Sequence, residues 1–97
     1  MNLLNTITEF EWDAGNSTKN WISHKVKKTE CEQVFFNKPI FISPDIRHSV
    51  NEERFLVLGK TKRGRKLFLS FTIRSNKIRV ITARDQNRKE RKQYEKV

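Results

Sequence analysis

The chain has 97 residues and a formal net charge of +10, from 21 Lys and Arg against 11 Asp and Glu. This length predicts a single domain over residues 1–97, because domains of about 100–150 residues are the commonest size. Hydrophobic residues make up only 35% of the chain, but seven Phe and two Trp supply apolar area for a compact core, which argues against disorder. Neither a signal-peptide pattern nor an apolar run of about 20 residues is present, so we expect a cytoplasmic protein without a membrane span.

The first half of the chain predicts a strand over residues 9–13 and short helices over 17–24 and 30–36, after an N-terminal extension over 1–8. The strand is indicated by alternating polar and apolar side chains. Asn16 or Ser17 can cap the first helix, behind a turn. The spacing Thr29-x-x-Glu32 is that of a capping box, and Pro39 ends the second helix because proline cannot continue one.

The second half predicts strands over residues 40–42, 54–58, 67–74 and 77–83, and a helix over 86–96. Residues 67–74 alternate most clearly, and the two-residue turn Ser75-Asn76 predicts a tight antiparallel hairpin after them. Asp85 can cap the last helix, whose residues are nearly all polar. The expected architecture is α+β: short N-terminal helices, an antiparallel sheet of three or four strands, and a charged C-terminal helix.

The excess of basic residues favours a polyanionic partner, because such a charge raises the local concentration of nucleic acid or of an acidic protein. Charge alone does not choose between these two partners, and a merely solvated basic surface is a further alternative. The single cysteine, Cys31, leaves no internal disulfide and no cysteine-based zinc site, and we expect it in the core.

The sequence lacks the patterns of several common kinds of catalytic site. The two histidines, His24 and His48, lie far apart in the chain, and neither has a metal-ligand spacing. Serine, histidine and aspartate occur without a nucleophile motif, and the three glycines form no phosphate-binding loop. We therefore expect no metal and no cofactor.

What the chain does carry is a set of basic side chains beside Trp, Phe and Tyr, and RNA offers chemistry to such a set without a metal. The 2′-hydroxyl of RNA attacks the adjacent phosphate if a base takes its proton, cations stabilise the charged phosphorane, and an acid protonates the leaving oxygen. Histidine is the usual acid or base near neutral pH, and arginine suits a bidentate clamp on phosphate.

The candidates for this chemistry in the first half of the chain each have a structural alternative. On composition alone, His24 is as consistent with a surface histidine in a basic linker as with a catalytic acid or base. For His48 a turn-stabilising role is the favoured interpretation. Arg54 opens a strand, and Glu52 and Glu53 just before it could pair with it instead of leaving it free for phosphate.

The candidates in the second half have alternatives as well. Arg79 lies on the polar face of a strand, which either meets solvent or forms a site. Arg84, Arg88, Arg91 and Tyr94 fall near one side of the last helix, but a charge-rich helix is usually only solvated. The residues expected to bind the RNA backbone are Lys25, Arg65, Lys66, Arg88 and Arg91.

Short motifs along the chain resemble those of the BrnT toxins in their order and spacing. The N-terminal ones are Phe10-Glu11-Trp12-Asp13, Asn20, His24 and Val34-Phe35-Phe36; the middle ones are Asp45-x-Arg47-His48-Ser49-x-x-Glu52-Glu53-Arg54-Phe55, Leu58-Gly59 and Gly64-Arg65; the last are Arg79-Val80-Ile81-Thr82-Ala83-Arg84, Glu90-Arg91 and Tyr94-Glu95. The family usually has Lys-His-Gly where this chain has Ser23-His24-Lys25, and Asp-Pro where it has Asp13-Ala14.

The resemblance implies a RelE-like fold, a metal-independent endoribonuclease and inhibition of translation. It implies a cognate DNA-binding antitoxin that neutralises the toxin in a complex of two toxins with two antitoxins, which contacts operator DNA through the antitoxin. The catalytic residues that it implies are His24, Arg54, Arg79, Arg84 and Tyr94. His24 would be the acid or base, the arginines would hold phosphate, and Tyr94 would stack on a base or position a proton donor.

Two other classes of function are compatible with the sequence. A non-catalytic nucleic-acid-binding module would use the basic loop over residues 60–66 and the last helix, and would bind with a steep salt dependence. A partner-binding subunit would complement an acidic protein, its activity lost with the altered motif at residues 23–25.

Overall fold

The computed structural model describes residues 9–97, so the extension expected over residues 1–8 lies outside the described part. Its elements are β1 (Glu9–Phe10), α1 (Ala14–His24), α2 (Lys28–Phe36), β2 (Phe41–Pro44), the 3₁₀ turn η2 (Ile46–His48), β3 (Arg54–Lys60), β4 (Lys66–Arg74), β5 (Lys77–Asp85) and α3 (Arg88–Tyr94). The expected α+β class is confirmed, with short N-terminal helices and a charged C-terminal helix.

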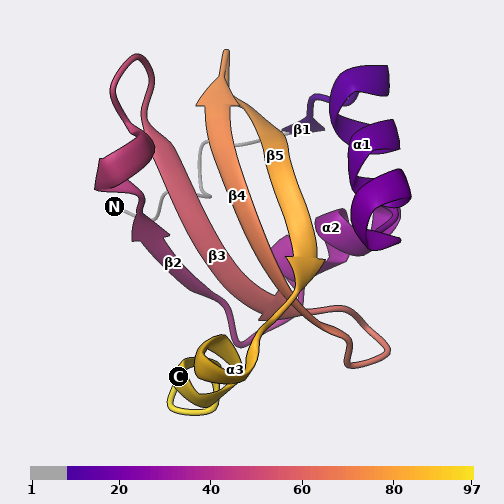
Figure 1. Ribbon diagram of the computed structural model, residues 1–97, viewed down its shortest axis with the longest axis vertical. Helices are drawn as coiled ribbons and strands as arrows, with labels where there is room; N and C mark the ends of the chain where they lie inside the picture. Colours follow the sequence, from indigo (N-terminus) through magenta and orange to yellow (C-terminus); the bar gives the residue numbers. More distant parts are fainter. Residues whose placement is uncertain (1–8) are drawn as a thin grey trace.

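The sheet has five strands in the order β1-β5-β4-β3-β2, where three or four were expected (Figure 1). It is mixed rather than antiparallel, because the two-residue strand β1 pairs with β5 in parallel while all other neighbours are antiparallel. The predicted hairpin between β4 and β5 is confirmed. Its turn residues Ser75 and Asn76 have φ of 50° and 63°, the left-handed values that a tight two-residue hairpin turn requires.

Helix α1 begins at Ala14, earlier than predicted, because Asp13 caps it. The Asp13 carboxylate accepts a hydrogen bond from the Asn16 backbone N–H at 3.1 Å, and the Asn16 side-chain oxygen accepts one from the Asp13 N–H at 2.8 Å. This reciprocal pair is a capping box. The segment that was predicted as a turn is therefore the first turn of the helix.

The other two helix caps also differ from the prediction by a few residues. Helix α2 begins at Lys28, and the Glu30 carboxylate accepts a hydrogen bond from the Lys27 N–H at 3.0 Å, so Glu30 takes the place expected for Glu32. Helix α3 is capped by Asn87, whose side-chain oxygen accepts a hydrogen bond from the Glu90 N–H at 2.8 Å. Asp85, the predicted cap, is the last residue of β5.

The core lies between the sheet and helices α1 and α2. Its buried residues are Val26, Cys31, Val34, Phe35, Val57, Leu67, Leu69, Phe71, Ile78, Val80 and Ala83. Phe35 of α2 packs edge-on against Phe71 of β4 with ring centroids 5.1 Å apart, a preferred aromatic geometry. Cys31 is 1% exposed, and burial raises the pKa of its thiol to about 12, as expected for a core residue.

Two buried asparagines join α1 to the free edge of β5, beyond the point where β1 ends. The Asn16 side-chain amide donates to the Val80 carbonyl at 3.1 Å, and the Asn20 side-chain oxygen accepts from the Ala83 N–H at 2.9 Å. Asn20 also donates to the Asn16 carbonyl at 2.8 Å. These side chains satisfy strand groups that no neighbouring strand reaches, which fixes the helix along the sheet edge.

Replacing Asn20 by alanine is expected to lower the free energy of unfolding by about 1–3 kcal/mol, because the buried Ala83 N–H loses the acceptor that Asn20 supplies. Denaturant unfolding of the two proteins measures the difference. The exposed Asn51 supplies the matched control, and its replacement by alanine should change stability by less than about 0.5 kcal/mol. Equal effects of the two substitutions would show that Asn20 does not fix α1 to the sheet.

A bulge interrupts the pairing of β4 with β5. Ser70 pairs with Thr82 but Phe71 pairs with Val80, so Ile81 is the extra residue on β5. Val80 and Ala83 are fully buried against the helices. A bulge breaks strict alternation, and Ile81 and Thr82 both reach the side of the sheet that α1 and α2 leave uncovered. We call this side the open face; its side chains include Arg54, Leu56, Phe68, Ser70, Ile81, Thr82 and Arg84.

Candidate functional site

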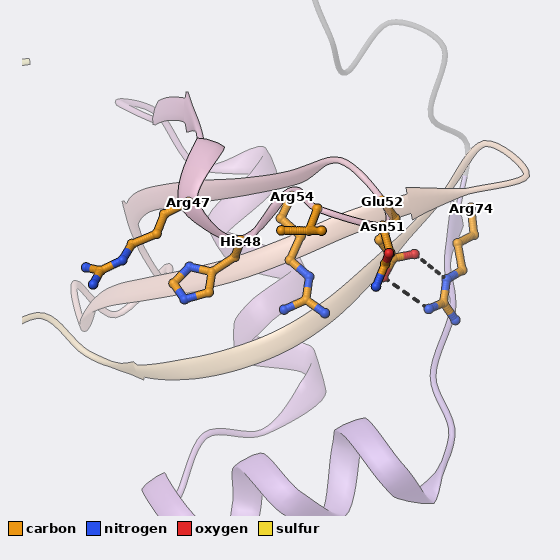
Figure 2. A pocket seen from close by; sticks show the side chains of 7 residues that line it. Arg47, His48, Asn51, Glu52, Arg54 and Arg74 are labelled. Carbon is orange, nitrogen blue, oxygen red and sulfur yellow. Dashed lines mark hydrogen bonds and ion pairs between the residues drawn. The ribbon is translucent and has the colours of Figure 1, made fainter.

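Two adjoining pockets lie where η2 meets the open face. The first, of about 440 Å³, is lined by Asp45, Arg47, His48, Arg54, Leu56, Phe68, Ser70, Ile81 and Thr82. The second, of about 480 Å³, is lined by Arg47, His48, Val50, Asn51, Glu52, Arg54 and Arg74. Three basic side chains belong to both, and in the view of Figure 2 His48 lies between Arg47 and Arg54. The junction of the pockets is therefore suited to an anion.

His48 is oriented by a carboxylate three residues before it. Its Nδ1 lies 2.9 Å from Oδ2 of Asp45, while the side chain remains 60% exposed. With Nδ1–H donating to Asp45, a neutral imidazole presents Nε2 as an acceptor. The turn itself is held by Ser49, whose hydroxyl donates to the Asp45 carbonyl at 2.6 Å and accepts from the Arg54 N–H at 3.0 Å. His48 therefore has one nitrogen fixed and one available.

Arg54 carries a guanidinium without an acidic partner. None of the ion pairs formed within residues 9–97 includes it, and its buried Nε has no hydrogen-bond partner there. Glu52, which the sequence offered as a competitor, binds Arg74 instead through two hydrogen bonds of 3.2 Å (Figure 2). Arg54 lines both pockets, so a guanidinium outside any ion pair of the described residues faces the space where a phosphate oxygen could bind.

Arg79, by contrast, is committed to an ion-pair cluster. Its guanidinium donates to Glu11 at 3.0 Å and to Asp13 at 2.9 Å, and its side chain is only 18% exposed. The hydrogen bond from Arg79 lowers the pKa of Asp13 and the same bond raises the pKa of Arg79. The cluster joins β5 to the start of α1, and Arg79 lines neither pocket.

Replacing Asp13 by asparagine should make the protein less sensitive to acid. Because the pKa of Asp13 is lowered in the folded state, its contribution to stability is present above the ordinary value of 3.8 and is lost as the pH falls through and below that value. Asparagine remains a good helix cap, so the substitution removes the charge and keeps the cap. The thermal midpoint of the wild type should fall more steeply than that of the variant between about pH 5 and pH 2. Parallel curves would show that the cluster does not contribute.

The candidates near α3 are engaged with the protein itself. Arg84 donates to both carboxylate oxygens of Glu90, at 2.8 and 2.9 Å, and its guanidinium lies 4.0 Å from the centre of the Phe68 ring. Tyr94 is 5% exposed, and its hydroxyl donates to the Pro39 carbonyl at 2.6 Å. It docks α3 and does not line either pocket. Arg91 donates to the Gln86 carbonyl at 2.7 Å, whereas Lys66 is half-buried and Arg88 is exposed.

A third group of candidates lies at the C-terminal end of β5, around Asp85. Arg65 donates to the carboxylates of Asp85 and Glu30 and to the carbonyls of His24 and Lys25. It therefore fixes the α1–α2 connection, and the exposed His24 belongs to this cluster rather than to the two pockets. Of the five expected catalytic residues, only Arg54 lines the pockets beside η2.

Lys25 occupies a position that favours glycine. It has φ 56° and ψ 40°, the left-handed conformation that ends α1, and the BrnT toxins usually have glycine there. Replacing Lys25 by glycine should raise the free energy of unfolding by about 1 kcal/mol, because the side chain is strained in this region. The neighbouring Ser23, inside the exposed end of the helix, is the control: glycine there should destabilise by a similar amount. A loss of stability in both variants would contradict the assignment of strain to Lys25.

The interpretation favoured from the sequence was a turn-stabilising role for His48, and neither Arg47 nor Phe68 was singled out. A signal for the first was present, because Asp45 and His48 stand three residues apart and one turn brings such residues together. The bulge that adds Ile81 to the pocket had no comparable signal. Among the residues that the structure describes, no three His, Cys, Asp or Glu side chains are grouped as metal ligands would be. None of the described helices could cross a membrane.

A small basic α+β domain with a histidine and unpaired arginine at an open pocket is fit for a phosphate-bearing ligand. The family model for the ribonuclease toxin BrnT of type II toxin–antitoxin systems matches residues 12–90, which include α1, α2 and all the strands that line the pockets. The chain belongs to this family, and the resemblance drawn from its motifs is confirmed. No curated protein matches the chain.

Proposed function

We propose that the protein is a metal-independent endoribonuclease whose active site is the junction of the two pockets beside η2. One observation carries the proposal: the Asp45–His48 pair and the unpaired Arg54 line the same pocket. A histidine with one free nitrogen beside an unsatisfied guanidinium provides a proton acceptor and an anion-binding group, the two elements that phosphodiester cleavage needs.

The reaction follows from these groups. Nε2 of His48 takes the proton of a ribose 2′-hydroxyl as its oxygen attacks the adjacent phosphorus. The guanidinium of Arg54 stabilises the negative charge that develops on the phosphate oxygens, and Arg47 binds a neighbouring phosphate. The bond to the 5′-oxygen breaks, that oxygen takes a proton from water, His48 returns its proton to the solvent, and the products end in a 2′,3′-cyclic phosphate and a 5′-hydroxyl. Asp45 keeps the imidazole in the required tautomer.

The remaining basic candidates have supporting roles in this proposal. Lys25, Lys66, Arg88 and Arg91 guide the RNA backbone through their charge. We assign the role of proton acceptor to His48 and not to His24, the residue implied by the resemblance, because His48 shares a pocket with Arg54 and His24 does not. Arg79 and Arg65 hold the scaffold around the site through their carboxylate partners.

The direct test is incubation with total RNA in excess chelator, with an Arg54→Ala variant purified identically as control. Cleavage by the wild type alone supports a metal-independent ribonuclease that uses Arg54. Cleavage by both proteins indicates a contaminant or a different site. If neither cuts, the protein needs a ribosome or is a nucleic-acid-binding module.

We further propose that cleavage in the cytoplasm arrests translation and that an antitoxin neutralises the toxin. A type II system pairs its toxin with a protein antitoxin, and the charge of +10 would complement an acidic partner. The DNA-binding nature of this antitoxin and the 2:2 complex follow from the resemblance. Growth on induction tests the pair: arrest that the neighbouring reading frame relieves supports it, and indifference to that frame contradicts it.

A further inference from the structure

We propose that the floor of the open face is a binding site for one unpaired RNA base, so that the substrate is single-stranded RNA; the inference rests on the proposed ribonuclease function. The floor consists of Leu56, Phe68 and Ile81, which line the same pocket as His48 and Arg54. It thus lies directly beside the groups that would act on the phosphate.

The apolar side chains of this floor do not belong to the hydrophobic core of the domain. The hydrophobic core is on the opposite side of the sheet, where α1 and α2 cover it (Figure 1). On the open face of a chain with a net charge of +10, three apolar side chains instead line a pocket that solvent reaches. The flat face of a nucleobase is the part of RNA that such a surface binds, whereas phosphate and ribose favour polar groups.

The bulge in β5 enlarges the floor. Regular alternation would send only one of Ile81 and Thr82 to the open face, but the extra residue places both in the pocket. Ile81 adds apolar area. Thr82 pairs across the strands with Ser70, so two hydroxyls lie next to each other at the edge of the floor, where they can donate to or accept from the edge of a base.

Arg84 completes the platform. Its guanidinium lies over the Phe68 ring, 4.0 Å from the ring centroid, and is held there by the two hydrogen bonds that it donates to the Glu90 carboxylate. Because a carboxylate already neutralises it, Arg84 is a poorer phosphate ligand than Arg54. A guanidinium fixed over the face of an aromatic ring instead offers its own outer face as a stacking surface for a base.

This arrangement selects against duplex RNA. A base on the floor has one face against side chains and its edge near Ser70 and Thr82, so it has left the stack and its pairing partner. A base within a double helix is stacked on both faces and cannot reach the floor. The site therefore accepts loops, linkers and unpaired strands.

An abasic scan tests the inference independently of cleavage. The probe is a fluorescent single-stranded 2′-deoxy oligonucleotide, which cannot be cleaved through a 2′-hydroxyl, and one abasic position is moved along it. Wild-type binding at constant salt should weaken about tenfold when the abasic position occupies the site, and much less at the others. The sensitivity should disappear in Phe68→Leu and in Ile81→Ser, whereas Phe36→Ala, which removes an aromatic ring 80% exposed on α2, should keep it.

A scan that is flat in the wild type, a scan unchanged in both floor variants, or equal affinity for a matched duplex would overturn the inference. Thermal midpoints of the variants show whether each is folded, and two different floor substitutions guard against loss of structure in one. Cleavage of the all-ribose strand is measured in parallel. A position-sensitive scan without cleavage supports the base site and contradicts the ribonuclease reaction. Cleavage with a flat scan supports the ribonuclease reaction and contradicts the base site.

Discussion

Replacement of Arg54 by alanine is expected to slow RNA cleavage by about 100-fold or more, with a thermal midpoint close to that of the wild type. The rate should fall because Arg54 lines the same pocket as His48 and forms no ion pair within the described residues. Loss of one preorganised donor at a developing oxyanion costs about 10²–10³ in rate. The midpoint should hold because the guanidinium forms no ion pair within residues 9–97.

Two further variants define what Arg54 contributes. Arg54→Lys keeps the charge but loses the planar fork, so it should restore only part of the rate. Arg63→Ala removes an exposed arginine from the β3–β4 connection and should change the rate only a few-fold, through general attraction of RNA. If Arg54→Ala and Arg63→Ala have equal effects, the arginine contributes charge alone. If Arg54→Ala unfolds the protein, it is a structural residue.

Replacement of His48 by alanine is expected to slow cleavage by about 10²–10⁴-fold, the usual contribution of a positioned acid or base. His48 has the geometry for this role because Asp45 fixes Nδ1 and most of the ring is exposed toward the pockets. His24→Ala is the matched control, since it removes the other histidine of the chain, and it should have a small effect. Single-turnover cleavage rates at saturating enzyme measure both.

The opposite result would be equally informative. A large loss in His24→Ala with normal cleavage by His48→Ala would assign the proton transfer to the cluster at the end of β5, as the resemblance implied. Asp45→Asn is a further test of the role of His48. Asparagine keeps the size of the side chain, but its neutral amide replaces the carboxylate that accepts the hydrogen bond from Nδ1–H of His48. It should reduce the rate less than His48→Ala and leave RNA affinity unchanged.

The sequence pattern correctly predicted elements that depend on residues close together in the chain, such as the β4–β5 hairpin. The alternation of β4 and the Ser75-Asn76 turn gave the central hairpin correctly, because turn geometry sets its register. The start of α1 was wrong since Gly15 resembled a turn residue, although Asp13 and Asn16 can form a capping box around it. The fifth strand and its parallel pairing depend on contacts between Glu9–Phe10 and β5, which lie far apart in the chain.

The candidate site was less predictable, for a related reason. Which arginine stays free depends on where carboxylates distant in the sequence are placed: Glu11 and Asp13 neutralise Arg79, and Glu30 and Asp85 neutralise Arg65. The sequence motifs and the charge made each of these arginines a candidate for contact with RNA. Only the three-dimensional arrangement separates Arg54 from the rest and gives His48 a place beside it.

Metal-independent cleavage by His48 is tested with an oligonucleotide that has a single ribose in an otherwise 2′-deoxy strand, incubated with the wild type in excess chelator. Mass spectrometry of the products identifies the ends that form. We expect one cut, on the 3′ side of the ribose, that leaves a 2′,3′-cyclic phosphate and a 5′-hydroxyl and that is absent with His48→Ala. Cleavage at deoxy positions, products with a 5′-phosphate, or an undiminished cut by His48→Ala would contradict it.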